Sequence, residues 1–181
     1  KWIWNKDKSS LKDEDYNEFY SQISYDFNKP LSYIHTQLEW ITSYKSVLFI
    51  PNEKNLFKNI EDHSIEFWPK LFVQNVMILE NCKDLLPVYL RFISWVVETQ
   101  DLPLNISREM LQSNPMLEKI KKWLTKKVLD KLKYELKENS ENYDKFLKKF
   151  WKILKEWIYY DNENKELIAW ILKFNSNLKS R

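Results

Sequence analysis

The spacing of hydrophobic residues predicts an amphipathic helix near the start of the chain. Apolar side chains recur at three- and four-residue intervals, which is the spacing of one helix face, and its members are Tyr16, Phe19, Tyr20, Ile23 and Phe27. Three acidic residues at 13–15 suit the first turn of a helix, because they oppose its partial positive charge. We predict a helix over residues 13–27, ended by the turn at Pro30.

The following hundred residues favour strands mixed with short helices. Strands are predicted over residues 31–39 and 44–50, then over the β-rich runs 71–79 and 93–99, with a short helix over 85–92 between them. Elements mixed in this way indicate an α/β fold. We expect an α/β/α sandwich with a central mixed sheet.

After residue 114 the pattern becomes purely helical. Asn114 and Pro115 suit the N-cap and first position of a long helix over 115–138. Ser140 is expected to cap a second helix, and a third is expected over about 162–174. Buried faces are predicted for Leu117, Ile120, Leu124, Val128, Leu132 and Leu136 in the first helix, Tyr143, Phe146, Phe150 and Ile153 in the second, and Leu167, Ile171 and Phe174 in the third. These helices predict a three-helix bundle, and hence two domains, an α/β unit over 1–114 and a helical extension over 115–181.

Composition narrows the class of protein. Hydrophobic residues make up 44% of the 181 residues and charged residues 30%, which favours a folded domain over a disordered chain. No apolar run approaches the roughly 18 residues of a membrane span, and no signal-peptide pattern is present. The single cysteine, Cys82, allows no intramolecular disulfide, so we expect a reducing cytoplasm. Because the chain begins at Lys1, we expect it to be part of a longer protein.

The stretch between the last predicted strand and the helical half carries the candidate site. In residues 101–112, Ser107 is a natural N-cap, and Arg108 falls in the first helical turn beside Glu109. An arginine there is mildly unfavourable unless an anion lies nearby, and Arg is well suited to fork onto a phosphate. Gln112 lies four residues later, on the same face. The alternative is a surface arginine paired with Glu98 or Glu109.

Other patterns suggest little chemistry. The two histidines, His35 and His63, lack metal-ligand spacing, so a metal site is not expected. No glycine-rich phosphate loop or hydrolase triad is evident. The helix over 115–138 carries eight lysines against four acids. This charge pattern is typical of a solvated helix face. The alternative is that the protein is a binding module that docks nucleic acid or an acidic partner through this helix.

The order of motifs resembles the middle domain of the ninety-kilodalton heat-shock chaperones, in particular the bacterial HtpG-like members. The resemblance covers residues 2–181 in the right order. Its strongest element is the stretch DLPLNISREMLQ at 101–112, which resembles the catalytic loop of that family. The supporting segments are WNKDKSSLKDEDYNEFYSQISYDFNKPL, SVLFIP, KLFVQNVMI and LPVYLRFI.

This resemblance implies a dimeric, ATP-driven chaperone. ATP and Mg²⁺ would be bound by a separate N-terminal domain, with none held by this segment alone. By the motif match Arg108 would contact the γ-phosphate and Gln112 would assist, while the loop is supported by Asn105, Ser107 and Glu109. Expected partners are the N-terminal ATPase domain, a C-terminal dimerisation domain and unfolded or partly folded client proteins, with no nucleic acid and no membrane. Client or domain docking is assigned to Phe27, Leu56 and Phe57, with core packing as the alternative.

The chain contains no glycine and 9 tryptophans. Average usage of about 7% would give roughly 13 glycines. The family resemblance leads us to expect glycine at Trp40, Trp68, Trp95, Trp151 and Trp157, and tryptophan at Trp4. Trp157 also falls at a predicted helix end that favours a left-handed glycine cap. We interpret these tryptophans as glycine codons read under the wrong genetic code; the alternative is a tryptophan-rich variant that packs poorly at these positions.

Overall fold

The computed structural model describes residues 2–24, 28–39, 43–51 and 68–178. The chain divides into two compact units, Lys1–Lys122 and Trp123–Arg181, and the division falls inside one long helix. The predicted domain boundary near residue 114 stays a prediction. No helix in the described ranges is both long and apolar enough to cross a membrane.

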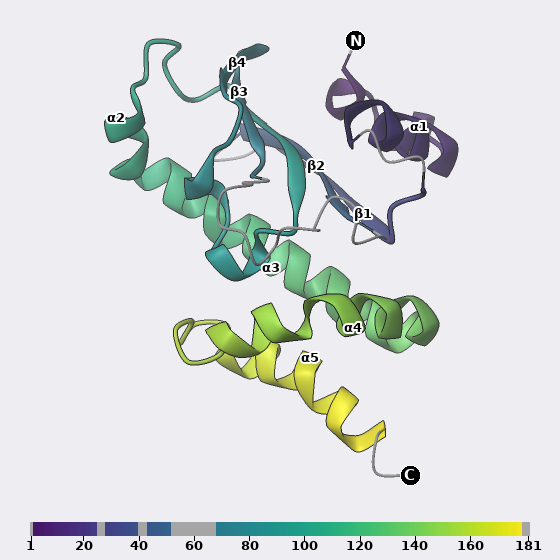
Figure 1. Ribbon diagram of the computed structural model, residues 1–181. Coiled ribbons are helices and arrows are strands. Elements are labelled where there is room, and N and C mark those ends of the chain that lie inside the picture. The colour runs from purple at the N-terminus through teal and green to yellow at the C-terminus, as the bar shows by residue number, and fades with distance from the viewer. Residues whose placement is uncertain (1, 25–27, 40–42, 52–67, 179–181) are drawn as a thin grey trace. The chain divides into compact units, whose positions relative to one another are not determined.

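The first unit is built on a mixed five-stranded sheet (Figure 1). The strands are β1 (Ser32–Glu39), β2 (Ser43–Ile50), β3 (Lys70–Val73), β4 (Val76–Leu79) and β5 (Ser94–Thr99). Their order is β1-β2-β5-β3-β4, with β5 parallel to β3 and all other neighbours antiparallel. The last strand of the sequence therefore lies at the centre of the sheet, and it delivers the chain to residues 101–112.

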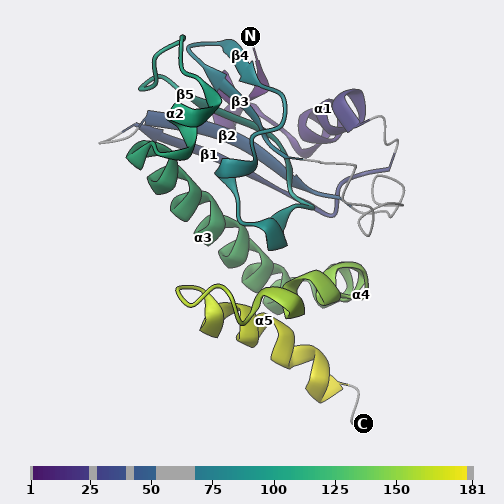
Figure 2. The ribbon, with the colours of Figure 1, turned by 60° about the vertical axis from the view of Figure 1, so that its left-hand side comes forward.

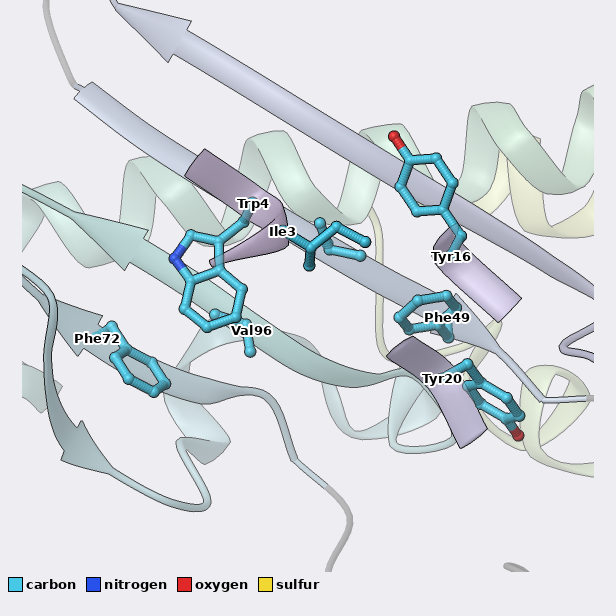
Figure 3. Close-up of a cluster of buried hydrophobic side chains, with 8 residues drawn as sticks. Ile3, Trp4, Tyr16, Tyr20, Phe49, Phe72 and Val96 are labelled. Atoms are coloured by element: carbon cyan, nitrogen blue, oxygen red, sulfur yellow. The ribbon is translucent and has the colours of Figure 1, made fainter. Parts of the chain in front are cut away.

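Helix α1 (Asp13–Ser24) covers one face of this sheet. Its Tyr16 and Tyr20 join Phe49 of β2, Phe72 of β3 and Val96 of β5 in one hydrophobic cluster (Figure 3). Trp4, in a 3-10 turn at Ile3–Asn5, is also part of the cluster and is 1% exposed. The predicted helical face of Tyr16, Phe19, Tyr20 and Ile23 is therefore the packed one, while Phe27 lies outside the described residues.

The opposite face is buried as well. Leu48 and Ile50 of β2, Leu71 and Val73 of β3, and Val97 of β5 are fully buried, although they alternate with the residues that face α1. Helix α2 (Arg108–Gln112) and helix α1 lie on opposite sides of the sheet in both ribbon views (Figures 1 and 2). A sheet buried on both faces is the α/β arrangement that the sequence predicts.

One predicted strand is wrong in detail. Residues 71–79 form two strands, β3 and β4, joined by a two-residue turn at Gln74 and Asn75. Both turn residues have positive φ, 49° and 66°, which is the turn conformation that fits the twist of a hairpin. Hydrophobic composition alone does not reveal such a turn when glycine is absent from it.

The predicted helix over 85–92 is also wrong. This segment contains two 3-10 turns, Lys83–Leu85 and Val88–Leu90. Pro87 separates them in an extended conformation, with ψ 153°. Proline has no N–H to continue a helix and disfavours the helical region for the residue before it.

The second unit consists of the greater part of α3 (Pro115–Glu138) with α4 (Ser140–Trp157) and α5 (Lys165–Leu178). The predicted apolar faces of the first two helices are buried throughout. In α5 Ile171 is buried as predicted and Leu167 is half-buried, while the side chain of Phe174 lies outside the described part of the chain. Tyr143 of α4 donates its hydroxyl hydrogen to the Ile171 carbonyl at 2.8 Å, which ties α4 to α5.

Helix ends in this unit depart from the prediction. Asn139, not Ser140, occupies the N-cap of α4, since a single residue separates α3 from α4. Helix α5 begins at Lys165, three residues later than predicted, because Asp161 accepts the Asn164 backbone N–H at 2.9 Å and forms a turn first. Helix α4 does end at Trp157, but Ile158 is in the right-handed helical region, so the expected left-handed cap is not formed.

Candidate functional site

The stretch 101–112 is fastened to the sheet where it begins. The Ser43 backbone N–H, at the start of β2, donates to Asp101 Oδ2 at 2.6 Å, and the Thr99 hydroxyl donates to the Ser43 carbonyl at 2.9 Å. On the other side of β5, Gln74 of the hairpin turn donates its backbone N–H to the Thr99 carbonyl at 3.2 Å. The end of β5 is therefore held by both neighbouring strands before the loop leaves the sheet.

Within the loop, three apolar side chains are buried, whereas Leu104 and Met110 are exposed. Leu102, Ile106 and Leu111 are 3%, 8% and 1% exposed, respectively. Asn105 is exposed, and the Ile106 N–H closes a turn on the Pro103 carbonyl at 3.3 Å. Three buried anchors in ten residues leave this loop little freedom to move as a whole.

Ser107 is the N-cap of α2, as the sequence predicts. Its hydroxyl oxygen accepts the Met110 N–H at 3.3 Å while its hydroxyl hydrogen is donated to Glu109 Oε2 at 3.0 Å. Glu109 therefore supports the cap rather than standing free in solvent. Because α2 has only five residues, its dipole is small, and the charge of Arg108 is the principal attraction for an anion here.

Arg108 and Gln112 are both exposed, at the first and last positions of α2. The proposed pairing of Arg108 with Glu98 or Glu109 is not observed: Glu98 is buried and bonded elsewhere, and Glu109 accepts from Ser107. Among the described residues no hydrogen bond or ion pair engages the Arg108 guanidinium. Its five donors are thus available to an anion.

Cys82 is not a reactive group of this site. Burial raises the pKa of its thiol to about 11, and the positive charge of Arg108 is only a minor influence in the other direction. A thiol that remains protonated at neutral pH is a weak nucleophile. The side chain is fully buried and acts as part of the core.

Sequence reasoning missed Glu98 as a structural centre of this region. Its carboxylate is 1% exposed and accepts hydrogen bonds from Trp4, Asn5, Asn75 and Gln100. The available signal is the strand period: Glu98 shares a face of β5 with Val96, which belongs to the hydrophobic cluster. A carboxylate on a buried face requires hydrogen-bond partners.

The other candidate residues do not converge on a second site. His35 lies in β1, half-buried against Tyr16, whereas His63, Leu56 and Phe57 fall outside the described residues. No group of three or more His, Cys, Asp or Glu side chains gathers in the parts of the chain that the structure describes. The docking role assigned to Phe27, Leu56 and Phe57 therefore has no structural description here.

Some of the lysines in the second half of α3 contact acidic or aromatic side chains. Lys131 pairs with Glu135 at 2.9 Å and lies over the Tyr134 ring, and Lys133 lies over the Trp170 ring at 5.0 Å. Lysines held over aromatic rings and beside acids on the same helix are typical of a solvated helix face.

Known proteins resemble this chain over nearly its whole length. The family described as Hsp90 protein matches residues 1–181. Chaperone protein HtpG of Hydrogenovibrio crunogenus is 40% identical over 179 residues, which are 98% of this chain and 28% of that protein. Chaperone protein HtpG of Helicobacter acinonychis is 42% identical over 179 residues, which are 99% of this chain and 28% of that protein. The chain thus spans a little over a quarter of the length of these relatives.

A solved structure shows the same fold. The middle domain of a heat shock protein from Plasmodium falciparum superposes with a TM-score of 0.78 at 28% identity, covering 94% of this chain and 64% of that one. The sequence match and the fold match therefore select the same part of the same family. This chain belongs to the Hsp90 family and corresponds to its middle domain.

Proposed function

We propose that this chain is the middle segment of an ATP-dependent chaperone of the HtpG type, and that it supplies Arg108 to the γ-phosphate of ATP held by another domain. The observation that carries the proposal is the state of Arg108. Its guanidinium is exposed, unpaired among the described residues, and placed at the end of a loop with three buried anchors. Such an arrangement suits an arginine that acts on a ligand from outside its own domain.

The chemistry required of this residue is electrostatic. Phosphoryl transfer spreads negative charge over the γ-phosphate oxygens, and a positioned arginine that stabilises this charge contributes about 10³ to 10⁵ in rate. Gln112, exposed at the other end of α2, has an amide that can donate to the same oxygens. Asn105, Ser107 and Glu109 would hold the loop in shape.

The remaining parts of the active site belong, in this proposal, to other domains. The N-terminal domain would bind ATP and Mg²⁺ and supply the carboxylate that activates water, and a C-terminal domain would form the dimer. Hydrolysis then depends on docking of the N-terminal domain against this segment, which links ATP turnover to the handling of client proteins in the cytoplasm. The names of the HtpG relatives and the exposed Arg108 support this assignment.

Replacing Arg108 with alanine in the full-length protein tests the proposal. We expect kcat for ATP hydrolysis to fall by about 10³ or more, because the transition-state charge loses its main partner, while the affinity for ATP remains almost unchanged. Arg108→Lys should retain part of the activity, since it keeps the charge but loses the two-pronged geometry. Lys119→Ala, which removes an exposed charge from α3, is the control and should leave kcat unaltered. Normal turnover in Arg108→Ala would exclude this role for Arg108.

A further inference from the structure

A cluster of polar side chains lies at the end of β5, next to the hydrophobic cluster beneath α1. We call it the Glu98 cluster, and its members are Trp4, Asn5, Asn75, Glu98 and Gln100. Glu98 Oε2 accepts the Trp4 indole N–H at 2.6 Å and the Asn5 amide at 3.0 Å. Glu98 Oε1 accepts the Asn75 backbone N–H at 2.8 Å and the Gln100 amide at 3.2 Å.

These four donors come from three separate parts of the first unit. Trp4 and Asn5 belong to the opening 3-10 turn, and Asn75 belongs to the hairpin turn. Gln100 directly follows β5 and precedes the loop at 101–112. Figure 3 shows the Trp4 ring between the opening turn and the strands, with Phe72 and Val96 beside it. One carboxylate therefore joins the beginning of the chain to the start of the loop that carries Arg108.

None of the four donors is a cation. Lys45 lies opposite Glu98 in the β2–β5 register, but its ammonium donates to Asn5 Oδ1 at 3.2 Å, so the Asn5 amide connects the two charges. A buried carboxylate is expensive unless its lone pairs are satisfied by well-placed donors. An apolar residue at position 98 would stabilise the fold as well as Glu98 does, because the same face already holds Val96 and Phe72.

The cluster also fixes the hairpin turn against the start of the loop. Asn75 has φ 66°, and the bond from its N–H to Glu98 lies beside two further contacts, from the Gln74 N–H to the Thr99 carbonyl and from the Gln74 amide to the Gln100 carbonyl at 3.4 Å. Asp101 and the buried Leu102 follow directly. A displacement of residues 98–100 would therefore also displace the loop, because Asp101 and Leu102 follow directly and are themselves fixed.

We propose that Glu98 is a positioning residue for the Arg108 loop, which it holds in register with the opening segment of this domain through Trp4 and Asn5. The inference rests on the proposed role of Arg108 in ATP hydrolysis and adds the residue that places it. Errors of about 1 Å in the position of a catalytic group can cost on the order of 10²-fold in rate. Loosening the start of the loop should therefore reduce turnover without touching the nucleotide.

The main test is Glu98→Gln in the full-length protein. Glutamine keeps the size but presents an NH₂ group to at least one of the four donors, so the cluster cannot form as it stands. We expect kcat for ATP hydrolysis to fall about tenfold, at a temperature well below Tm, with an unchanged dissociation constant for ATP. Glu80→Gln is the matched control. It removes a mostly exposed carboxylate that directly follows β4 and pairs with Lys70 at 2.9 Å, and it should leave kcat unaltered.

Two milder variants keep the test decisive if Glu98→Gln does not fold. Gln100→Ala removes one exposed donor, and Trp4→Phe removes the indole N–H while keeping a ring in the hydrophobic cluster. Each should lower kcat about threefold with ATP affinity intact. If Trp4 acts on the loop through the Glu98 carboxylate, Trp4→Phe should have almost no additional effect on kcat in the Glu98→Gln background. Unchanged kcat in both Gln100→Ala and Trp4→Phe would overturn the proposal.

Arg108→Ala, measured in parallel, separates the two possible failures. If Arg108→Ala abolishes turnover but folded Glu98→Gln retains full kcat, Glu98 only stabilises the fold and the positioning role is wrong. If Arg108→Ala also retains full kcat, the proposed function fails, and the role of Glu98 fails with it. A fall in Tm with no change in kcat for Glu98→Gln counts against positioning.

Discussion

At the scale of single residues, burial changes the chemistry of polar side chains in the first unit. His35 of β1 illustrates this outside the candidate site. Its Nδ1 lies 2.7 Å from the Tyr16 hydroxyl, and burial lowers the pKa of the imidazole to about 4, with the positive charge of Lys8 as a second cause and the Trp4 carbonyl acting weakly in the opposite direction. The ring is therefore neutral at physiological pH and acts as a packing residue beneath the opening segment.

This pKa predicts how stability depends on pH. The unfolded chain takes up a proton near the ordinary pKa of 6.5, while the folded protein does so only near 4. Stability from His35 is therefore full above pH 6.5 and is lost as pH falls from 6.5 towards 4. Allowing for partial exposure, we expect a loss on the order of 1–2 kcal/mol over that range.

Urea denaturation of wild type and His35→Gln between pH 7 and pH 5.5 measures this effect. The second histidine, His63, is present in both proteins and cancels from the comparison. The wild type should lose more stability than the variant as pH falls. Equal pH slopes would show that His35 is not the group responsible.

The tryptophans separate into two kinds at this scale. Trp4 is buried and hydrogen-bonded to Glu98, as a native tryptophan should be. Trp151, where glycine is expected from the family, is 37% exposed on α4 and contacts Lys155 through its ring face at 5.4 Å. Trp68 is 8% exposed, whereas Trp40 lies outside the described residues, as do the side chains of Trp95 and Trp157.

If glycine codons are read as tryptophan in the printed sequence, natively expressed protein must be lighter. Peptide mapping of that protein should find glycine at Trp151 and tryptophan at Trp4, so the peptide that contains position 151 should be lighter than the printed sequence by the Trp–Gly mass difference. Peptide masses that equal those of the printed sequence at all the tryptophan positions would refute the recoding hypothesis.

The sequence patterns predicted the residues of the Arg108 loop but not the buried Glu98 cluster beside it. The Ser107 cap and the exposure of Arg108 follow from local rules of helix ends. Glu98 was missed because a glutamate near the end of a strand ordinarily points to solvent, and its four partners come from positions 2 to 94 residues away in sequence. Only the three-dimensional arrangement brings those donors together.

At the scale of elements, periodic segments were predicted well and irregular ones were not. Helices α1, α3 and α4 show their buried faces directly in the sequence, and β1, β2 and β5 begin within one residue of their predicted starts. The β3–β4 hairpin was missed because its turn consists of Gln74 and Asn75, without the glycine that usually marks such turns. Only the backbone requirement for positive φ distinguishes this turn from a continuous strand.

The hairpin turn offers a test of backbone strain. Gln74 adopts φ 49°, which costs a non-glycine residue about 1–2 kcal/mol, and asparagine tolerates this region better. We expect Gln74→Asn to stabilise the protein by about 0.5–1 kcal/mol and Gln74→Val to destabilise it by at least as much. Thermal denaturation of both variants measures the difference, and a lower Tm for Gln74→Asn than for Gln74→Val would contradict the account.

At the scale of the whole molecule, the chain corresponds to the middle domain of the Hsp90 family. Its first unit carries the loop and its supports, and its second unit packs Tyr143, Phe146 and Phe150 of α4 with Ile168 and Ile171 of α5 in a core of its own. The fold class and the family could be predicted from sequence, because a long colinear resemblance constrains both. The client or domain docking assigned to Phe27, Leu56 and Phe57 stays a prediction, because these residues lie outside the described part of the chain.

We propose that this segment completes an ATPase site by supplying Arg108. To test this, the purified chain is added to a separately purified N-terminal domain of the same chaperone, and ATP hydrolysis is measured. We expect hydrolysis to rise with added chain and Arg108→Ala to abolish the rise. A folded wild-type chain that gives no stimulation, or stimulation that persists in Arg108→Ala, would contradict this proposal.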